Sequence, residues 1–137
     1  MTVEELLIRD EGLVLHAYED SLGYQTIGVG RLIDRRRGGG ITKDEALYLL
    51  RNDIARVERD LDDKLPWWRS LDGARQQVLA CMCFQLGIGG LLEFVRTLQA
   101  VREGRFVAAA SFMLESRWAA QTPGRAREMA RLMREGA

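Results

Sequence analysis

Residues 11–30 interrupt a sequence that is otherwise patterned for helices. Apolar residues recur at helical spacing elsewhere, but residues 14–34 lose that period. Strand-forming residues appear instead at 17–18 and 24–27, and the turn-like Ser21-Leu22-Gly23 lies between them. The pattern therefore predicts a small β-hairpin within a mostly helical chain.

A short amphipathic helix is predicted for residues 3–11, directly before the hairpin. Glu4 and Glu5 enrich its first turn, which suits the helix dipole, and Gly12 provides a C-terminal stop. Glu11 is then the last helical residue. A carboxylate at this end opposes the dipole, so its position calls for a partner or a functional purpose.

A long helix is predicted beyond the hairpin. The run Arg35-Arg36-Arg37-Gly38-Gly39-Gly40 is typical of a flexible, exposed loop. Thr42 and Glu45 then form a capping box, and apolar residues keep a helical period to about residue 63, before Pro66. Such a helix after a small β-rich segment suggests that it connects two lobes.

The remaining sequence predicts further helices. Asp72 is an N-cap for a helix that is apolar nearly all round and ends at Gly87, so we expect it to be the central core helix. A turn at 87–90 and short helices near 91–102 and 106–114 follow. Thr122 as N-cap before Pro123 predicts a final helix to about Arg134. The core-filling methionines are expected to be Met82, Met113, Met129 and Met133.

Composition narrows the classes of function. The chain has 137 residues, 47% of them hydrophobic, with a formal net charge of zero, so neither disorder nor strong attraction to a nucleic acid is expected. Cys81 and Cys83 are interpreted as buried free thiols, and the single histidine, His16, as an exposed bystander. We expect no metal and no cofactor. The N-terminus lacks signal-peptide features, and no apolar stretch reaches the ~20 residues that span a bilayer.

Three polar residues of the interrupted stretch are unremarkable singly. Glu11 is compatible with an exposed helix-end glutamate, Asp20 with a turn aspartate and Thr26 with a strand residue. A hairpin that folds Asp20 and Thr26 back toward Glu11 would bring two carboxylates to one cleft. Most glycoside hydrolases use a pair of carboxyl groups to cleave a glycosidic bond.

Together these residues resemble a known pattern. Glu11, Asp20 and Thr26, separated by eight and five residues, resemble the catalytic triad of phage-type lysozymes, the endolysins similar to the T-even phage lysozyme. The resemblance extends in preserved order over nearly the whole chain. Its other segments are Asp10-Glu11-Gly12-Leu13, Tyr18, Gly23-Tyr24, Thr26-Ile27-Gly28, residues 41–46, Phe84-Gln85 with Gly87, Ser116-Arg117-Trp118, Gln121-Thr122-Pro123 and Arg125-Ala126.

The resemblance implies an α+β, mostly helical, two-lobed lysozyme-like fold in a single domain, residues 1–137. Residues 12–45 would form the small β-containing N-terminal lobe, and residues 42–63 the interlobe helix. Residues 1–11 and 64–137 would form the helical lobe.

The implied activity is a muramidase that hydrolyses the β-1,4 bond between N-acetylmuramic acid and N-acetylglucosamine in peptidoglycan. Glu11 would be the general acid that protonates the leaving oxygen. Asp20 and Thr26 would hold the attacking water on the opposite face of the sugar, which implies an inverting reaction. Arg125 matches the family arginine that pairs with the catalytic glutamate.

Substrate contacts and departures also follow from the resemblance. Cleft-lining positions are matched by Gly30, Leu32, Phe84 and Gln85, although Leu32 and Phe84 are equally compatible with ordinary core. Arg31 and Asp53 replace a family histidine–aspartate pair, so we expect an ion pair between them. The arginine–glycine loop replaces a much longer segment of the small lobe.

Two other classes of function compete with an enzyme. One is a wall-binding module without catalysis, and the other is a membrane-active protein whose arginines lie between residues 117 and 134. The leading interpretation is a monomeric endolysin in the host cytoplasm, without stable membrane association, whose release by a holin the resemblance implies. Its partners would be peptidoglycan glycan strands.

Overall fold

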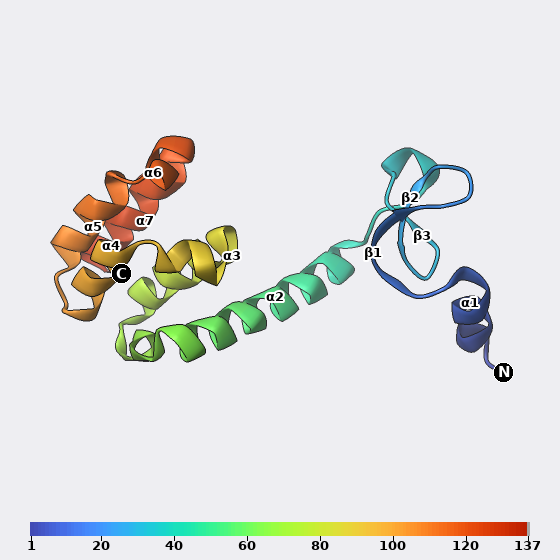
Figure 1. Ribbon diagram of the computed structural model, residues 1–137, viewed down its shortest axis with the longest axis horizontal. Helices are drawn as coiled ribbons and strands as arrows, with labels where there is room; N and C mark the ends of the chain where they lie inside the picture. Colours follow the sequence, from blue (N-terminus) through green and yellow to red (C-terminus); the bar gives the residue numbers. More distant parts are fainter. Residues whose placement is uncertain (137) are drawn as a thin grey trace. The chain divides into compact units, whose positions relative to one another are not determined.

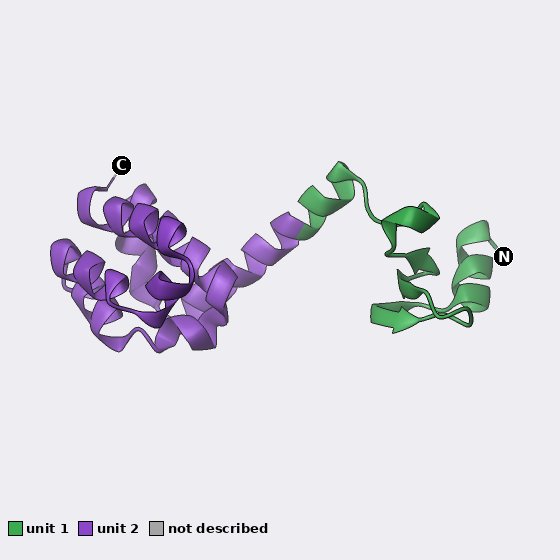
Figure 2. Ribbon diagram, turned by 90° about the horizontal axis from the view of Figure 1, so that it is seen from above, with its two compact units in different colours: residues 1–49 green, residues 50–137 purple. Residues whose placement is uncertain are grey.

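The computed structural model describes residues 1–136. The chain divides into two compact units after Leu49 (Figure 2), called here the N-terminal unit, residues 1–49, and the C-terminal unit, which begins at residue 50. Residues 1–42 hold one helix, a small sheet and a short 3-10 turn, and six further helices follow in the described chain (Figure 1). The architecture confirms the predicted α+β, mostly helical class.

Helix α1, Val3–Glu11, begins and ends where its sequence signals predict. The Thr2 hydroxyl accepts the N–H of Glu5 at 3.1 Å, while the Glu5 carboxylate accepts the N–H of Thr2 at 2.9 Å. These reciprocal bonds satisfy two of the backbone donors that a helix start leaves free. Gly12 has φ 81°, a conformation that glycine adopts without strain, and it ends the helix directly after Glu11.

Three antiparallel strands follow in the order β1, β2, β3, with bounds Val14–Glu19, Gln25–Gly28 and Arg31–Leu32. Thr26 of the central strand lies opposite Tyr18 on one side and Leu32 on the other. A register shift between Val14 and Tyr18 bends the first ladder. The predicted hairpin is therefore extended by a third short strand.

The segment predicted as an irregular loop at 35–40 instead contains a 3-10 turn, Arg35–Arg37. The Asp34 carboxylate accepts the Arg36 N–H at 2.9 Å and so caps the turn. Gly38, with φ 73°, ends it. The sequence prediction missed this cap because three glycines and three arginines in succession resemble a loop.

Helix α2, Lys43–Lys64, spans the boundary between the units as one continuous helix. The Thr42 hydroxyl accepts the Glu45 N–H at 3.1 Å and the Glu45 carboxylate accepts the Thr42 N–H at 2.9 Å, so the predicted capping box is confirmed. Val57 and Leu61 are its buried residues. After α2, the 3-10 turn η2, Pro66–Ser70, redirects the chain.

Helix α3, Gly73–Leu92, is longer than predicted. The Asp72 carboxylate caps it by accepting the Arg75 N–H at 3.3 Å. At Gly87 the backbone leaves helical geometry, with φ 74° and ψ 162°, but helical structure resumes after this kink. The predicted turn at 87–90 is therefore wrong beyond Gly87 itself.

The chain closes with α4, α5, α6 and α7, which span Val95–Arg102, Phe106–Leu114, Arg117–Gln121 and Pro123–Glu135. The sequence prediction omitted α6, whose N-cap Ser116 accepts the Ala119 N–H at 3.2 Å. Thr122 occupies the N-cap position of α7, but its hydroxyl donates to the Trp118 carbonyl at 3.0 Å and caps nothing. The start of α7 was predicted correctly, and its capping bond was not.

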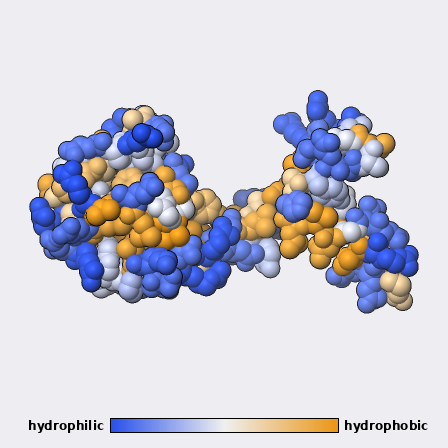
Figure 3. All heavy atoms as spheres, viewed as in Figure 1, coloured by the Kyte–Doolittle hydropathy of each residue, from blue (hydrophilic) through white to orange (hydrophobic). Residues whose placement is uncertain are grey.

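The hydrophobic core of the C-terminal unit gathers side chains from every helix between α2 and α7. Leu61, Leu79 and Met113 are fully buried, as the apolar pattern of α3 and its neighbours predicts. Of the two cysteines only Cys83 is buried, and Cys81 is exposed, which corrects the expectation of two buried thiols. Figure 3 shows hydrophobic surface among hydrophilic residues on this unit, whose exposed large apolar side chains include Phe84, Val95, Val107 and Leu114.

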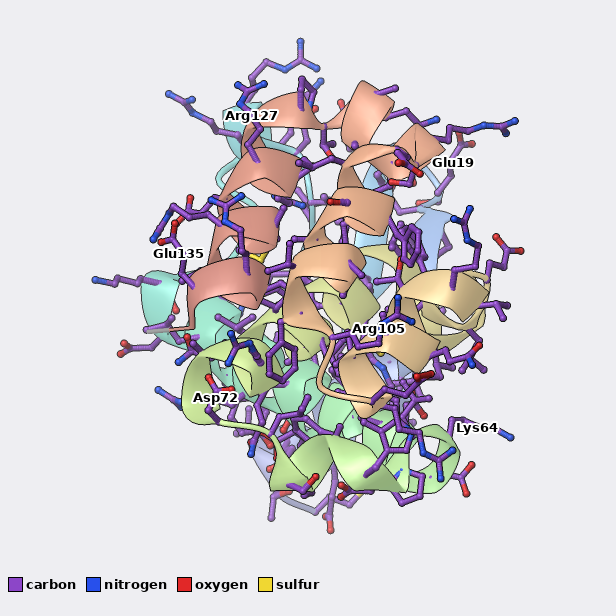
Figure 4. All side chains as sticks on the ribbon, turned by 90° about the vertical axis from the view of Figure 1, so that its left-hand side faces the viewer. Glu19, Lys64, Asp72, Arg105, Arg127 and Glu135 are labelled. Carbon is purple, nitrogen blue, oxygen red and sulfur yellow. The ribbon has the colours of Figure 1, made fainter. Side chains whose placement is uncertain are left out.

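Arg75 connects the start of α3, which follows Asp72, to the end of α7 at Glu135; Figure 4 labels Asp72 and Glu135. Its guanidinium donates to the carbonyl oxygens of Met133 at 2.7 Å and Arg134 at 3.1 Å. The same group lies 3.6 Å from the ring centroid of Phe106. Arg75 thus satisfies carbonyl groups that the helix end leaves without partners.

Among residues 1–136 no single helix is long and apolar enough to cross a membrane, and α3 with α4 meets that test only as a pair bent by 106°.

The assignment of residues 1–11 to the helical lobe stays a prediction.

Candidate active site

Glu11 and Gly30 lie against each other in the N-terminal unit. Glu11 is the exposed last residue of α1, and Gly30 lies in the turn between β2 and β3 with φ 63°. A Cβ added at Gly30 would stand 2.8 Å from Glu11 Oε2. The carboxylate therefore occupies space that only a glycine leaves open.

Asp20 shapes the turn between β1 and β2. Its Oδ1 accepts the N–H groups of Leu22 at 2.9 Å and Tyr24 at 2.8 Å, while its own N–H donates to the Tyr24 carbonyl at 2.8 Å. This is the side-chain-to-backbone bonding that favours Asp in turns. Within residues 1–49 no hydrogen bond uses Oδ2, so that oxygen is available to a ligand.

Thr26 is buried, with 2% of its surface exposed. Its Oγ1 donates to the Tyr24 carbonyl at 3.0 Å. Tyr24 therefore donates through its backbone N–H to Asp20 and accepts through its carbonyl from Thr26. Tyr24 thus connects two of the three predicted catalytic residues, although the sequence analysis assigned it no role. Its position in the sequence between Asp20 and Thr26 could have indicated this connection.

Leu32 pairs with Thr26 across the sheet and is half-buried. The structure thus places five predicted site residues in the N-terminal unit, at the end of α1 and on the small sheet and its turns: Glu11, Asp20, Thr26, Gly30 and Leu32.

Arg31 and Asp53 are each paired within their own unit. Arg31 donates to Glu45 at 3.2 Å in the N-terminal unit, and Asp53 accepts from Arg56 at 3.0 Å in the C-terminal unit. The Thr42 backbone N–H that bonds Glu45 lowers the pKa of that carboxyl, and the nearby Arg31 charge adds to this. The expected Arg31–Asp53 pair stays a prediction.

The other predicted site residues belong to the C-terminal unit. Gln85 of α3 is half-buried, and its Oε1 accepts the Trp118 indole N–H at 2.9 Å. Phe84 is exposed, and so is Arg125 in the first turn of α7. Arg125 has no ion pair within residues 50–136, and its pairing with Glu11 stays a prediction.

A pocket of about 550 Å³ lies beside Trp118 in the C-terminal unit. Phe94 meets the Trp118 ring edge-on, with centroids 6.0 Å apart, and the Arg96 guanidinium lies 4.1 Å from the centroid of the Phe112 ring. Sequence reasoning did not single out this pocket, because its aromatic residues come from α5, α6 and the residue before α4 and carry no shared spacing.

The N-terminal unit thus offers a proton donor or acceptor at a helix end, a second carboxylate with a free oxygen, and a buried hydroxyl. Such a set suits acid–base work on a neutral polar bond. Among residues 1–136 no group of three or more histidine, cysteine, aspartate or glutamate side chains is placed to hold a metal ion.

Comparison with known proteins places residues 9–134 within the profile of a family described as phage lysozyme. The pre-baseplate central spike protein Gp5 of Enterobacteria phage T4 is 33% identical over 99% of this chain, which spans 28% of the spike protein. Two probable T4-type lysozymes of Dictyostelium discoideum, numbered 1 and 2, are each 26% identical over 98% of this chain and 95% of their own length.

Proposed function

Because the chain belongs to the phage lysozyme family, we propose that it is a lysozyme-type glycoside hydrolase that cuts peptidoglycan. The bond we assign is the β-1,4 linkage between N-acetylmuramic acid and N-acetylglucosamine. The observation that carries the proposal is the fit of the Glu11 carboxylate against Gly30, on the same small sheet that holds Thr26 and Asp20.

Glu11 acts in this proposal as the general acid that protonates the leaving oxygen. Its place at the end of a rigid helix, exposed to solvent and abutting a glycine, supports that role because a substrate oxygen can approach it. Arg125 is proposed as its ionic partner.

Asp20 and Thr26 hold the attacking water. The free Oδ2 of Asp20 supports this role, since that oxygen can accept a proton from water while Oδ1 remains fixed by two N–H groups. A water held on the opposite face from the acid gives inversion at the anomeric carbon, which needs carboxyl groups about 6.5–9.5 Å apart.

Substrate contacts are proposed at Gly30, Leu32, Phe84 and Gln85. Since Trp118 occupies Oε1 of Gln85, the Gln85 NH₂ group is left to donate to an acetamido carbonyl. Phe84 offers an exposed apolar face on α3.

In its biological role the chain would act as a monomeric endolysin, stored in the host cytoplasm and released by a holin to lyse the cell. A second candidate is local opening of the wall as one part of a larger assembly. The 33% identity to a phage central spike protein favours that alternative.

The proposal is tested by replacing Glu11→Gln and measuring release of soluble fragments from dye-labelled peptidoglycan. Loss of a general acid should slow hydrolysis by roughly 100-fold or more. Glu4→Gln is the matched control, since Glu4 lies exposed on the same helix, and it should retain the wild-type rate. Lysis of whole cells by Glu11→Gln without release of labelled fragments would instead favour membrane disruption, and wild type that binds the wall without cutting it would favour a binding module.

A further inference from the structure

The N-terminal unit carries a local positive charge that the net charge of the chain conceals. Residues 31–40 hold four arginines and one aspartate, although the whole chain has a formal charge of zero. Arg36 pairs with Asp34 at 2.9 Å and Arg31 pairs with Glu45 at 3.2 Å. Arg35 and Arg37 have no acidic partner within residues 1–49, so two exposed cations remain available to an external anion.

The turn that carries these cations, Arg35–Arg37, is fixed to the sheet. The Gly40 N–H donates to the Leu32 carbonyl at 2.8 Å, and Gly39 packs so closely on Leu32 that an added Cβ would collide with its carbonyl oxygen. The Arg31 guanidinium also donates to the Gly40 carbonyl at 3.2 Å. A fixed turn presents its side chains at a lower entropic cost than a free loop.

The turn also borders the candidate active site. The Arg37 guanidinium lies 4.0 Å from the centroid of the Tyr24 ring, a cation–π contact. Tyr24 is the residue whose backbone bonds both Asp20 and Thr26. Tyr24 thus contacts this cation through its ring and the two residues proposed to hold water through its backbone.

We infer that Arg35 and Arg37 bind the carboxylates of the stem peptides that branch from the glycan strand, and so orient the strand at the hairpin. This inference depends on the proposed function, because it concerns how that substrate is recognised. A guanidinium offers a planar pair of donors that matches a carboxylate, and peptidoglycan peptides carry such groups at regular intervals beside the bond to be cut.

The test compares two substrates that contain the same glycosidic bonds. One is intact peptidoglycan, and the other is glycan strands from which an amidase has removed the peptides. Initial rates of reducing-end release give the half-saturating substrate concentration and the maximal rate. The variants are Arg35→Gln alone, whose side chain has no partner within residues 1–49, Arg35→Gln with Arg37→Gln, and Arg37→Lys.

The double variant should raise the half-saturating concentration for intact peptidoglycan by roughly 3- to 10-fold, as expected for two exposed ion pairs. Its behaviour on peptide-free glycan should match the wild type. Arg35→Gln should give a smaller increase in the same direction, and Arg37→Lys should lose part of the binding, since an ammonium keeps the charge but not the paired donors. The effect should shrink at high salt, which screens exposed charges.

A control of equal charge change is Arg59→Gln with Arg102→Gln, two exposed arginines without ion pairs within residues 50–136. It should leave both substrates unaffected. Equal losses on the two substrates, or none on either, would refute the inference and leave the proposed function intact. Unchanged hydrolysis together with lost binding to phosphatidylglycerol vesicles would assign the turn to a membrane surface and also refute it. Wild type that cuts neither substrate would refute the proposed function itself.

Discussion

At the scale of single residues, the contact between Glu11 and Gly30 decides where the proposed acid lies. Replacing Gly30→Ala would place a methyl group 2.8 Å from Glu11 Oε2, so the carboxylate must move. A displacement of this size should lower kcat by roughly 10- to 100-fold. Steady-state hydrolysis of peptidoglycan measures it.

Gly28→Ala is the matched control for backbone strain. Gly28 also has a positive φ, 71°, but an added Cβ there meets nothing within 4 Å. Both variants should lose about 1–2 kcal/mol of stability from the left-handed backbone, and only Gly30→Ala should lose most of its activity. Equal activity in the two variants would show that the position of Glu11 does not depend on Gly30.

The sequence predicts individual residues well where the cause is local. The end of α1 at Glu11 follows from the helical pattern and the adjacent Gly12. The contact with Gly30 was not predictable, because it depends on how the β2–β3 turn folds back onto α1. The role of Tyr24 lies in its backbone groups, which its side-chain identity does not reveal.

At the scale of elements, the kink in α3 gives a sharp contrast between two glycines. Gly87 has φ 74° and ψ 162°, a conformation that residues with a side chain rarely adopt. Gly87→Ala should therefore lower the free energy of unfolding by about 1–3 kcal/mol. Gly89 is exposed and helical, and a Cβ added there would meet open space. Gly89→Ala should therefore raise the free energy of unfolding by about 0.5–1 kcal/mol. Chemical denaturation measures both, and two changes of the same sign would contradict the kink.

The junction of α2 and η2 should make stability depend on pH. Asp62 accepts from Arg69 at 2.8 Å and from the Trp68 indole N–H at 2.7 Å, and these bonds lower the pKa of its carboxyl, the Arg69 bond most strongly. A folded-state pKa below the unfolded value means that the stabilisation is present above the unfolded pKa, about 4, and is lost as the pH falls through the folded value.

Asp62→Asn should therefore lower Tm near neutral pH and reduce the fall of Tm between about pH 5 and about pH 2. Thermal unfolding followed by circular dichroism measures this. Asp63→Asn is the neighbouring control, since Asp63 has only a 3.6 Å contact with Lys64, and it should retain the wild-type pH dependence. A parallel loss in both variants would contradict a special role for Asp62.

Elements were predictable where capping chemistry acts within a few residues. Thr42 with Glu45 and Asp72 with Arg75 mark the starts of α2 and α3 as their sequences predict. The short helix α6 was missed, because five residues are too few to establish a period. Thr122 was given the wrong bond, since the alternative acceptor, the Trp118 carbonyl, appears only once α6 has formed.

At the scale of the whole molecule, the overall class was predictable because the loss of helical period at residues 14–34 is a strong signal. The proposed site draws on both units, with Glu11, Asp20 and Thr26 in one and Gln85 and Arg125 in the other. Local patterns cannot specify such long-range groupings, and the resemblance of the sequence to phage-type lysozymes supplied them.

The central claim is hydrolysis of the muramyl bond with Glu11 as the acid, and mass spectrometry of the digestion products tests it most directly. Peptidoglycan treated with wild type should yield fragments ending in reducing N-acetylmuramic acid, and Glu11→Gln should yield almost none. Fragments ending in the anhydro form would show that no water attacks the sugar, and reducing N-acetylglucosamine ends would show that another bond is cut; either result would contradict the account.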